Sequence, residues 1–154
     1  MSELRHAVEV RTPIEAAFTC FVDDIGDWWP REHTWADHDL AKIAIEPKQG
    51  GRCYERALDG RERIWGRVLE WEPPGRFVFS WQIAPDRRLI ADPDDASEVE
   101  VSFREREGEM VTEVELVHRG FERHGEEGDA YREALAAERG WPYILERYAS
   151  AASG

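Results

Sequence analysis

The histidine at position 118 is the titratable side chain best placed to do chemistry. It shares one face of an alternating segment with Val114 and Leu116, and Tyr131 and Tyr143 follow it along the chain. A histidine in such a place can hydrogen-bond a ligand carbonyl or act as a general acid or base. The competing interpretation is a buried histidine whose nitrogens bond to backbone groups, because buried polar atoms are usually satisfied.

Glu55 is the second candidate for acid–base chemistry, because it shares a strand face with Cys53. An inward carboxylate is costly unless it is paired or used, and Arg67 is the cation expected to pair with it. An outward Glu55 would have no functional meaning. Two cysteines, Cys20 and Cys53, make no disulfide framework, and neither has the neighbours that activate a nucleophile.

Aromatic side chains are the residues best suited to binding an apolar ligand, and the chain has seven tryptophans. Trp28, Trp29 and Trp35 lie in the irregular segment 25–40 and predict either a pocket mouth or a plug at one end of a sheet. The other candidates lie on apolar faces and either line a cavity or fill the core: Phe79, Trp81, Phe103, Leu116, Tyr131 and Trp141.

Metal and cofactor sites are not expected. His33, Asp37 and His38 lie together in the irregular segment, but their spacing fits no metal-ligand motif. The sequence has no glycine-rich phosphate loop and no zinc-finger spacing.

Hydrophobic periodicity predicts the elements that position these side chains. A helix is expected from Thr12 as N-cap, with Pro13 in the first helical position, to Asp23–Asp24. A second short helix ends near Trp28. A long helix runs over 129–149, interrupted by a glycine and a proline. The polar stretch 84–97 predicts a mobile loop. Strands are predicted at 5–11, 41–46, 52–58, 61–72 with a bulge or bend at Gly66, 76–83, 98–105 and 111–118.

This order predicts an α+β fold, in which a curved antiparallel sheet of six to seven strands wraps around the long C-terminal helix. Two short helices follow the first strand. The last helix is the element long enough to cover the apolar face of such a sheet. A wedge between sheet and helix that is lined by aromatics is a natural ligand cavity. The length of 154 residues predicts a single domain, 1–154.

Charge and hydropathy exclude several partners. The 20 Lys and Arg against 33 Asp and Glu give a formal net charge of −13. With no basic patch in view, nucleic acids and anionic membranes are not expected partners. No run approaches the roughly 18 apolar residues of a membrane span. The N-terminal segment has no apolar signal-peptide stretch, so a cytoplasmic protein is expected.

The sequence resembles the START-like (SRPBCC) superfamily of helix-grip proteins of the Bet v 1 type. It is most similar to the bacterial stand-alone proteins related to the C-terminal domain of the Hsp90 ATPase activator. The segments that carry the resemblance are 12–18, the turn 50–52, 66–81, 116–121 and Gly140-Trp141. Members include lipid and hormone binders, polyketide cyclases and aromatases. The activator's first domain has no counterpart here, so an Hsp90-like chaperone is not an expected partner.

Three functions follow from these observations. The first is binding of a small apolar or aromatic ligand between the sheet and the C-terminal helix. The second is an enzyme on the same cavity, a cyclase, aromatase or hydrolase-like catalyst that uses His118 or Glu55. The third is a protein-interaction module of the Hsp90-cochaperone kind. Homodimerisation stays open.

Overall fold

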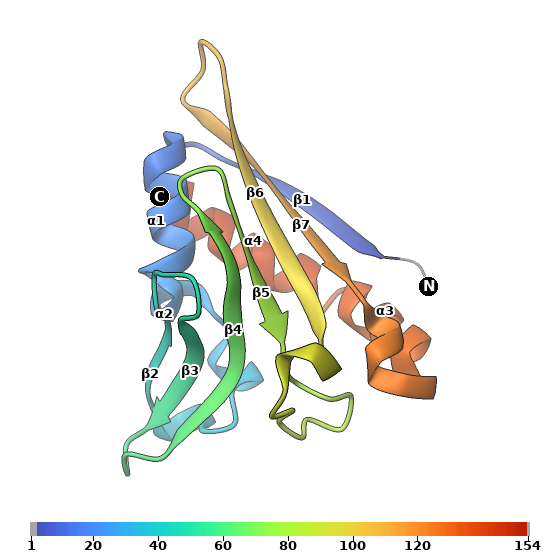
Figure 1. Cartoon of the computed structure of the whole chain (residues 1–154). Coiled ribbons are helices and arrows are strands. Elements are labelled where there is room, and N and C mark those ends of the chain that lie inside the picture. Colours follow the sequence, from blue (N-terminus) through green and yellow to red (C-terminus); the bar gives the residue numbers. More distant parts are fainter. Residues whose placement is uncertain (1–2, 154) are drawn as a thin grey trace.

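The computed structural model describes residues 3–153, which form a seven-stranded antiparallel sheet with the helices packed on its concave side (Figure 1). Residues 1, 2 and 154 of the predicted domain lie outside the described residues. The strand order is β1-β7-β6-β5-β4-β3-β2. The strands are β1 (Leu4–Val10), β2 (Leu40–Ile45), β3 (Arg52–Ala57), β4 (Glu62–Glu72), β5 (Arg76–Trp81), β6 (Ser97–Arg106) and β7 (Val111–Arg119).

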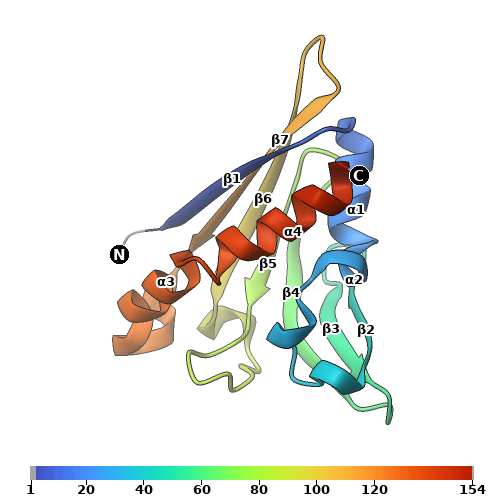
Figure 2. The ribbon, with the colours of Figure 1, turned by 180° about the vertical axis from the view of Figure 1, so that it is seen from behind.

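Two helical segments pack against this sheet. The first consists of α1 (Ile14–Val22) and α2 (Ile25–Trp28), and the second of α3 (Gly128–Ala136) and α4 (Trp141–Ser153). Figure 2 shows α4 crossing the concave face of the sheet, with α3 beyond one end. Short 3-10 turns, η1 (Arg31–His33), η2 (Asp37–Asp39), η3 (Pro93–Asp95) and η4 (Phe121–Glu127), lie in the connections. The predicted α+β helix-grip architecture is confirmed.

The C-terminal helix bends where the glycine and proline predicted an interruption. A Cβ atom on Gly140 would lie 2.2 Å from the carbonyl oxygen of Leu135, so the chain can turn this tightly only at a glycine. Pro142 is in the first turn of α4, where a missing N–H costs no helical hydrogen bond. The helical segment is therefore divided into α3 and α4, and α3 leaves the axis of α4 (Figure 2).

The start of α1 differs from the prediction. Pro13, not Thr12, occupies the N-cap position, and no side chain of the cap residue bonds to the helix. The N–H of Ile14 instead donates to the carboxylate of Glu105 on β6, at 2.8 Å. A tertiary contact thus replaces the local cap that the Thr12-Pro13 pair predicted.

Aromatic rings fill the core where α1 and α4 meet the sheet. The ring centroids of Phe18 and Phe103 are 5.1 Å apart, and those of Phe21 and Tyr148 are 4.8 Å apart. The Tyr148 hydroxyl donates to the carbonyl of Ala17 at 2.8 Å, which ties α4 to α1. Aromatic pairs in favourable geometry stabilise a core by about 0.5–1.5 kcal/mol each beyond area burial. Side chains therefore fill the core at this end of the sheet.

A β-bulge in β4 confirms the bend predicted at Gly66. Cys53 pairs with Gly66 while Tyr54 pairs with Ile64, so Trp65 is the extra residue on β4. A Cβ atom on Gly66 would lie 2.4 Å from the carbonyl oxygen of Ser80, which requires glycine there. The bulge breaks the alternation of β4 and buries both Trp65 and Gly66.

The connection after β5, predicted as a mobile loop, contains η3 and an isolated bridge between Ile83 and Leu89. The side-chain amide of Gln82 donates to the backbone carbonyl of Ile90 at 2.8 Å, which ties the start of this connection to its middle. Separately, no helix within residues 3–153 has the length and apolar content that crossing a bilayer requires.

Candidate functional site

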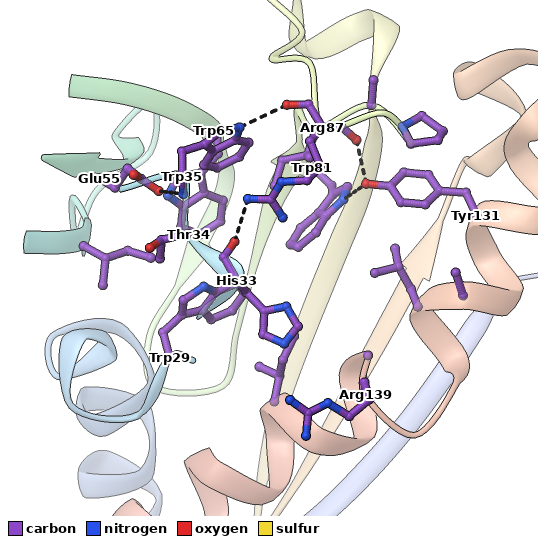
Figure 3. Close-up of a pocket in the computed structure, with 18 residues that line it drawn as sticks. Trp29, His33, Thr34, Trp35, Glu55, Trp65, Trp81, Arg87, Tyr131 and Arg139 are labelled. Carbon is purple, nitrogen blue, oxygen red and sulfur yellow. Dashed lines mark hydrogen bonds between the residues drawn. The ribbon is translucent and has the colours of Figure 1, made fainter. Parts of the chain in front are cut away.

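A cavity of about 220 Å³ lies between the sheet and the C-terminal helices, at the end of the sheet away from α1. Segments 29–35 and 83–87 border it on one side, and α3 and the start of α4 border it on the other (Figure 3). Its apolar walls are Trp29, Trp35, Ile43, Trp65, Trp81, Ile83, Leu135 and Ile144.

Three buried indole rings form the inner wall of this cavity. Trp29 and Trp65 are stacked, with centroids 5.6 Å apart and an interplanar angle of 20°. Trp81 packs against both, at 6.4 Å from Trp29 and 6.2 Å from Trp65. Large flat rings held by their neighbours in this way present rigid π-faces to whatever fills the space.

Trp35 and Arg87 join the two segments at the mouth of the cavity. The Trp35 indole N–H donates to the backbone carbonyl of Arg87 at 3.1 Å. The Arg87 guanidinium lies over the Trp35 ring, 4.8 Å from its centroid, and donates to the carbonyl of His33 at 3.1 Å. These contacts hold the segment around Trp35 against the segment around Arg87 (Figure 3).

Glu55 is fully buried and orients the segment that carries Trp35. Its two carboxylate oxygens accept the backbone N–H groups of Trp35 at 3.1 Å and Ala36 at 2.9 Å. The cation beside it is Arg63, with 3.6 Å between guanidinium nitrogen and carboxylate oxygen. The expected pairing with Arg67 is wrong, because the bulge at Trp65 shifts the register and sets Arg63 opposite Glu55.

Tyr131 closes the cavity from α3. Its hydroxyl donates to the carbonyl of Ile83 at 2.8 Å and accepts the indole N–H of Trp81, also at 2.8 Å. Burial raises the pKa of Tyr131 to about 12, so the phenol stays neutral at physiological pH. Both of its hydrogen-bonding roles are used within the protein, which makes Tyr131 a wall residue rather than a base.

Two buried nitrogens beside the cavity have no hydrogen-bond partner among the described residues: Nε2 of His33 and Nε1 of Trp65. An unsatisfied buried donor or acceptor costs about 1–3 kcal/mol. Burial lowers the pKa of His33, so its imidazole is neutral at physiological pH. A neutral imidazole with one free nitrogen can exchange a proton with a bound molecule.

His118 does not line the cavity. It packs beside Trp81, with ring centroids 5.5 Å apart, and is fully buried. Its Nδ1 accepts the indole N–H of Trp141 at 3.1 Å, and its Nε2 bonds the hydroxyl of Ser97 at 2.8 Å. That hydroxyl also bonds Nε2 of His124 at 2.6 Å. His118 is thus satisfied, although by side chains and not by the backbone groups expected.

The structure brings together about half of the residues that the sequence singles out. Those at the cavity are Trp29, Trp35, Trp81, Tyr131 and Glu55. Those away from it, in the packed core, are Trp28, Phe79, Phe103, Leu116, His118 and Trp141. Trp28 packs against Phe21 and Tyr148, and Trp141 supports Trp29 and Trp81 from behind the wall.

The sequence matches the model of the Activator of Hsp90 ATPase homolog 1-like protein family over residues 11–152. The chain belongs to this family. No curated protein matches the sequence.

Solved structures in the same fold include a synthase and a resistance protein. An anthrahydroquino-γ-pyrone synthase, Txn09, is 37% identical, with a TM-score of 0.67, and the match covers 97% of this chain and 96% of that one. CalC from Micromonospora echinospora, a self-sacrificing resistance protein, is 29% identical with a TM-score of 0.67 and coverage of 97% and 93%. Protein NE0264 from Nitrosomonas europaea, at 13% identity, TM-score 0.65 and coverage of 97% and 93%, shares the fold.

Sequence reasoning missed most of the other residues that line this family member's cavity, and those with aromatic or titratable side chains are His33, as a binding candidate, Trp65, Arg87 and Arg139. Trp65 had one available signal, its position directly before the bulge glycine Gly66. Arg87 lies in the polar stretch 84–97, which has no periodicity, and Arg139 is a polar residue of the predicted helix 129–149. Only the fold brings the two arginines to one cavity.

Proposed function

We propose that this protein binds a small, planar aromatic molecule in the cavity between the sheet and the C-terminal helices. The observation that carries the proposal is the wall of three rigid indoles, Trp29, Trp65 and Trp81, with Trp35 at the mouth. Flat aromatic ligands stack on such walls and lose little conformational entropy on binding. The 37% identity to a synthase that forms an anthrahydroquino-γ-pyrone supports a ligand of fused rings.

The size of the cavity limits how such a ligand is bound. At about 220 Å³ it is smaller than the roughly 300–1,000 Å³ of typical ligand pockets. A molecule of several fused rings would therefore place one end against the indoles and extend through the mouth between Arg87 and Arg139. The exposed Ala134 of α3 lies on this path.

Filling this path with a large side chain tests the proposal. Anthraquinone-2-carboxamide, a neutral planar probe, is expected to bind with a negative heat-capacity change in calorimetry, because apolar surface is buried. Ala134→Trp should weaken binding by at least about tenfold, a change of about 1.4 kcal/mol. Ala136→Trp is the matched control, since Ala136 is exposed on the same helix but does not line the cavity. Absence of probe binding by the unmodified protein, or equal weakening by both variants, would contradict the proposal.

A second candidate function is ring closure on the bound molecule, favoured by the identity to a synthase and by the free Nε2 of His33 beside the cavity. Both nitrogens of His118 are occupied, so His33 is the better proton carrier. A His33→Gln variant that turned over a cyclisable substrate as fast as the unmodified protein would remove this candidate.

A further inference from the structure

The mouth of the cavity carries two arginines, although the chain has a formal net charge of −13. Arg87 comes from the connection after β5 and Arg139 from the turn between α3 and α4. In Figure 3, His33 lies between them. Two cations at one opening of an acidic protein need an explanation, because acidic side chains are abundant enough to neutralise them.

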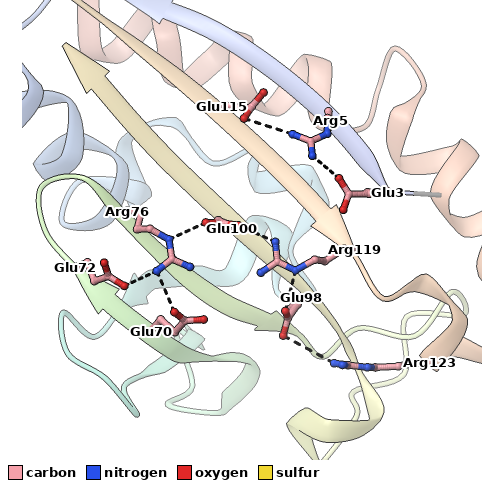
Figure 4. Close-up of polar contacts among 10 residues, drawn as sticks. All are labelled: Glu3, Arg5, Glu70, Glu72, Arg76, Glu98, Glu100, Glu115, Arg119 and Arg123. Atoms are coloured by element: carbon pink, nitrogen blue, oxygen red, sulfur yellow. Dashed lines mark hydrogen bonds and ion pairs between the residues drawn. The ribbon is translucent and has the colours of Figure 1, made fainter. Parts of the chain in front are cut away.

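Arginines on the outer face of the sheet show what pairing looks like in this protein (Figure 4). Arg76 contacts Glu70, Glu72 and Glu100, with 2.7 Å to Glu100. Arg119 bonds Glu98 at 2.9 Å and Glu100 at 2.7 Å. There, the carboxylates outnumber these two arginines, and both guanidinium groups are neutralised, which leaves no free positive charge for a ligand.

Arg87 is not paired in this way. Its guanidinium donates to the carbonyl of His33 and covers the ring of Trp35, and no carboxylate of residues 3–153 lies within ion-pair distance. Arg139 lies over the ring of Tyr143 at 4.4 Å and reaches Glu32 at 3.5 Å, with 71% of its side chain exposed. The guanidinium of Arg87 therefore keeps most of its donors free.

The charges of both arginines reach into the cavity. Burial is the largest cause of the lowered pKa of His33; Glu32 opposes it, while Arg139 and Arg87 lower it further. The charge of Arg87 also lowers the pKa of Tyr131, whereas burial raises it. The guanidinium of Arg87, which has no carboxylate partner among residues 3–153, therefore favours an anion over a neutral molecule at the mouth of the cavity.

The backbone fixes Arg87 in its place. Its φ angle is 72°, in the left-handed region that non-glycine residues rarely occupy, at a cost of about 1–3 kcal/mol. The N–H of Arg87 donates to the carbonyl of Ala84 at 2.8 Å, and its carbonyl accepts from Trp35. The turn fixes the backbone of Arg87, and the contacts with the ring of Trp35 and the carbonyl of His33 hold its guanidinium at the mouth.

We propose that the aromatic ligand is an acid, and that its ionised oxygen, a carboxylate or a phenolate, binds Arg87 with Arg139 as the second cation. This inference rests on the proposed function and specifies the ligand class. The planar guanidinium donates two parallel hydrogen bonds to a carboxylate, which are charge-assisted and stronger than neutral ones. The rings would lie on the indole wall and the acidic group at the mouth.

The test compares two probes of nearly the same shape, one charged and one neutral: anthraquinone-2-carboxylate and anthraquinone-2-carboxamide. The unmodified protein is expected to bind the carboxylate about tenfold more tightly, equivalent to about 1.4 kcal/mol. Arg87→Gln should bring this ratio close to one, and Arg87→Lys should retain part of it. Arg88→Gln, which removes the same charge from an exposed neighbour outside the cavity, should leave the ratio unchanged. Added salt should weaken the carboxylate alone.

The ratio of the two probe affinities distinguishes direct recognition of the carboxylate by Arg87 from a structural role of Arg87 in the loop. Because Arg87 also holds Trp35 and His33, Arg87→Gln can weaken both probes through the loop, and a purely structural role would lower both affinities equally. Equal binding of both probes by the unmodified protein, or a ratio that Arg87→Gln leaves intact, overturns this inference and leaves the proposed function standing. Failure of both probes to bind overturns the two together.

Discussion

Replacement of Glu55 by glutamine is expected to lower the free energy of unfolding by about 3 kcal/mol and to weaken the binding of aromatic probes. The carboxylate is fully buried and accepts two backbone N–H groups, from Trp35 and Ala36. An amide group has one acceptor oxygen, so one of the two N–H groups would face the NH₂ group of the glutamine. The charge of Arg63, 3.6 Å away, would also lose its partner.

Urea unfolding measures the first effect and calorimetric titration with anthraquinone-2-carboxamide measures the second. Glu62→Gln is the matched control, because Glu62 lies on the neighbouring strand β4, opposite Arg56, and bonds arginine side chains, Arg52 and Arg56, near the surface. Surface pairs of this kind contribute roughly 0–1 kcal/mol. If Glu55→Gln proved as stable as Glu62→Gln, Glu55 would not be the residue that orients the mouth of the cavity.

The alternation of apolar residues determines the sheet well enough to be predicted. In β6, Val99, Val101 and Phe103 alternate with polar residues, and the structure buries these three. The same pattern holds in β7, and both strands were predicted to within two residues. Alternation fails in β4, where the bulge adds Trp65 and changes which residues face inward. A bulge is a property of paired strands, and the partner strand is not visible from one segment of sequence.

The cavity could be predicted only in part, for a physical reason. Periodicity identifies the apolar face of the sheet, but α4 covers most of that face and leaves one end open. Phe103 and Trp81 lie on similar faces, yet Phe103 packs under Phe18 of α1 while Trp81 lines the cavity. Phe103 is covered because α1 packs over it, and this tertiary contact is not visible in the periodicity of the strands. Glu55 lies on β3, but the segment around Trp35 that it binds is a loop, and Arg87 also lies on a loop. The paths of these loops have no period.

Acidification is expected to destabilise the protein through His118. Trp141 can only donate, so Nδ1 of His118 must accept, and the neutral imidazole carries its hydrogen on Nε2 toward Ser97. Protonation would set a second N–H against the indole N–H of Trp141. Burial, and to a smaller degree the neighbouring His124, hold the pKa of His118 well below its ordinary value of 6.5.

The sign of the effect follows from proton linkage. In the unfolded chain His118 titrates near its ordinary pKa of 6.5, whereas in the folded protein it stays neutral to lower pH. The unfolded state therefore binds more protons as the pH falls below that value. The stabilisation is fully present above the unfolded pKa and is lost at about 1.4 kcal/mol per pH unit until the folded pKa is reached.

Urea unfolding between about pH 7.5 and pH 4.5 checks this expectation, and the loss that is due to His118 should accumulate below its ordinary pKa of 6.5. His118→Gln has no imidazole to titrate, so its free energy of unfolding should fall less steeply over the same range. Carboxylates and the other histidines titrate in both proteins and cancel in the difference. His38→Gln is the control, since the side chain of His38 is 95% exposed and should keep the unmodified slope. Parallel slopes for His118→Gln and the unmodified protein would show that the buried chain from Trp141 through His118 to Ser97 and His124 accepts a proton without penalty.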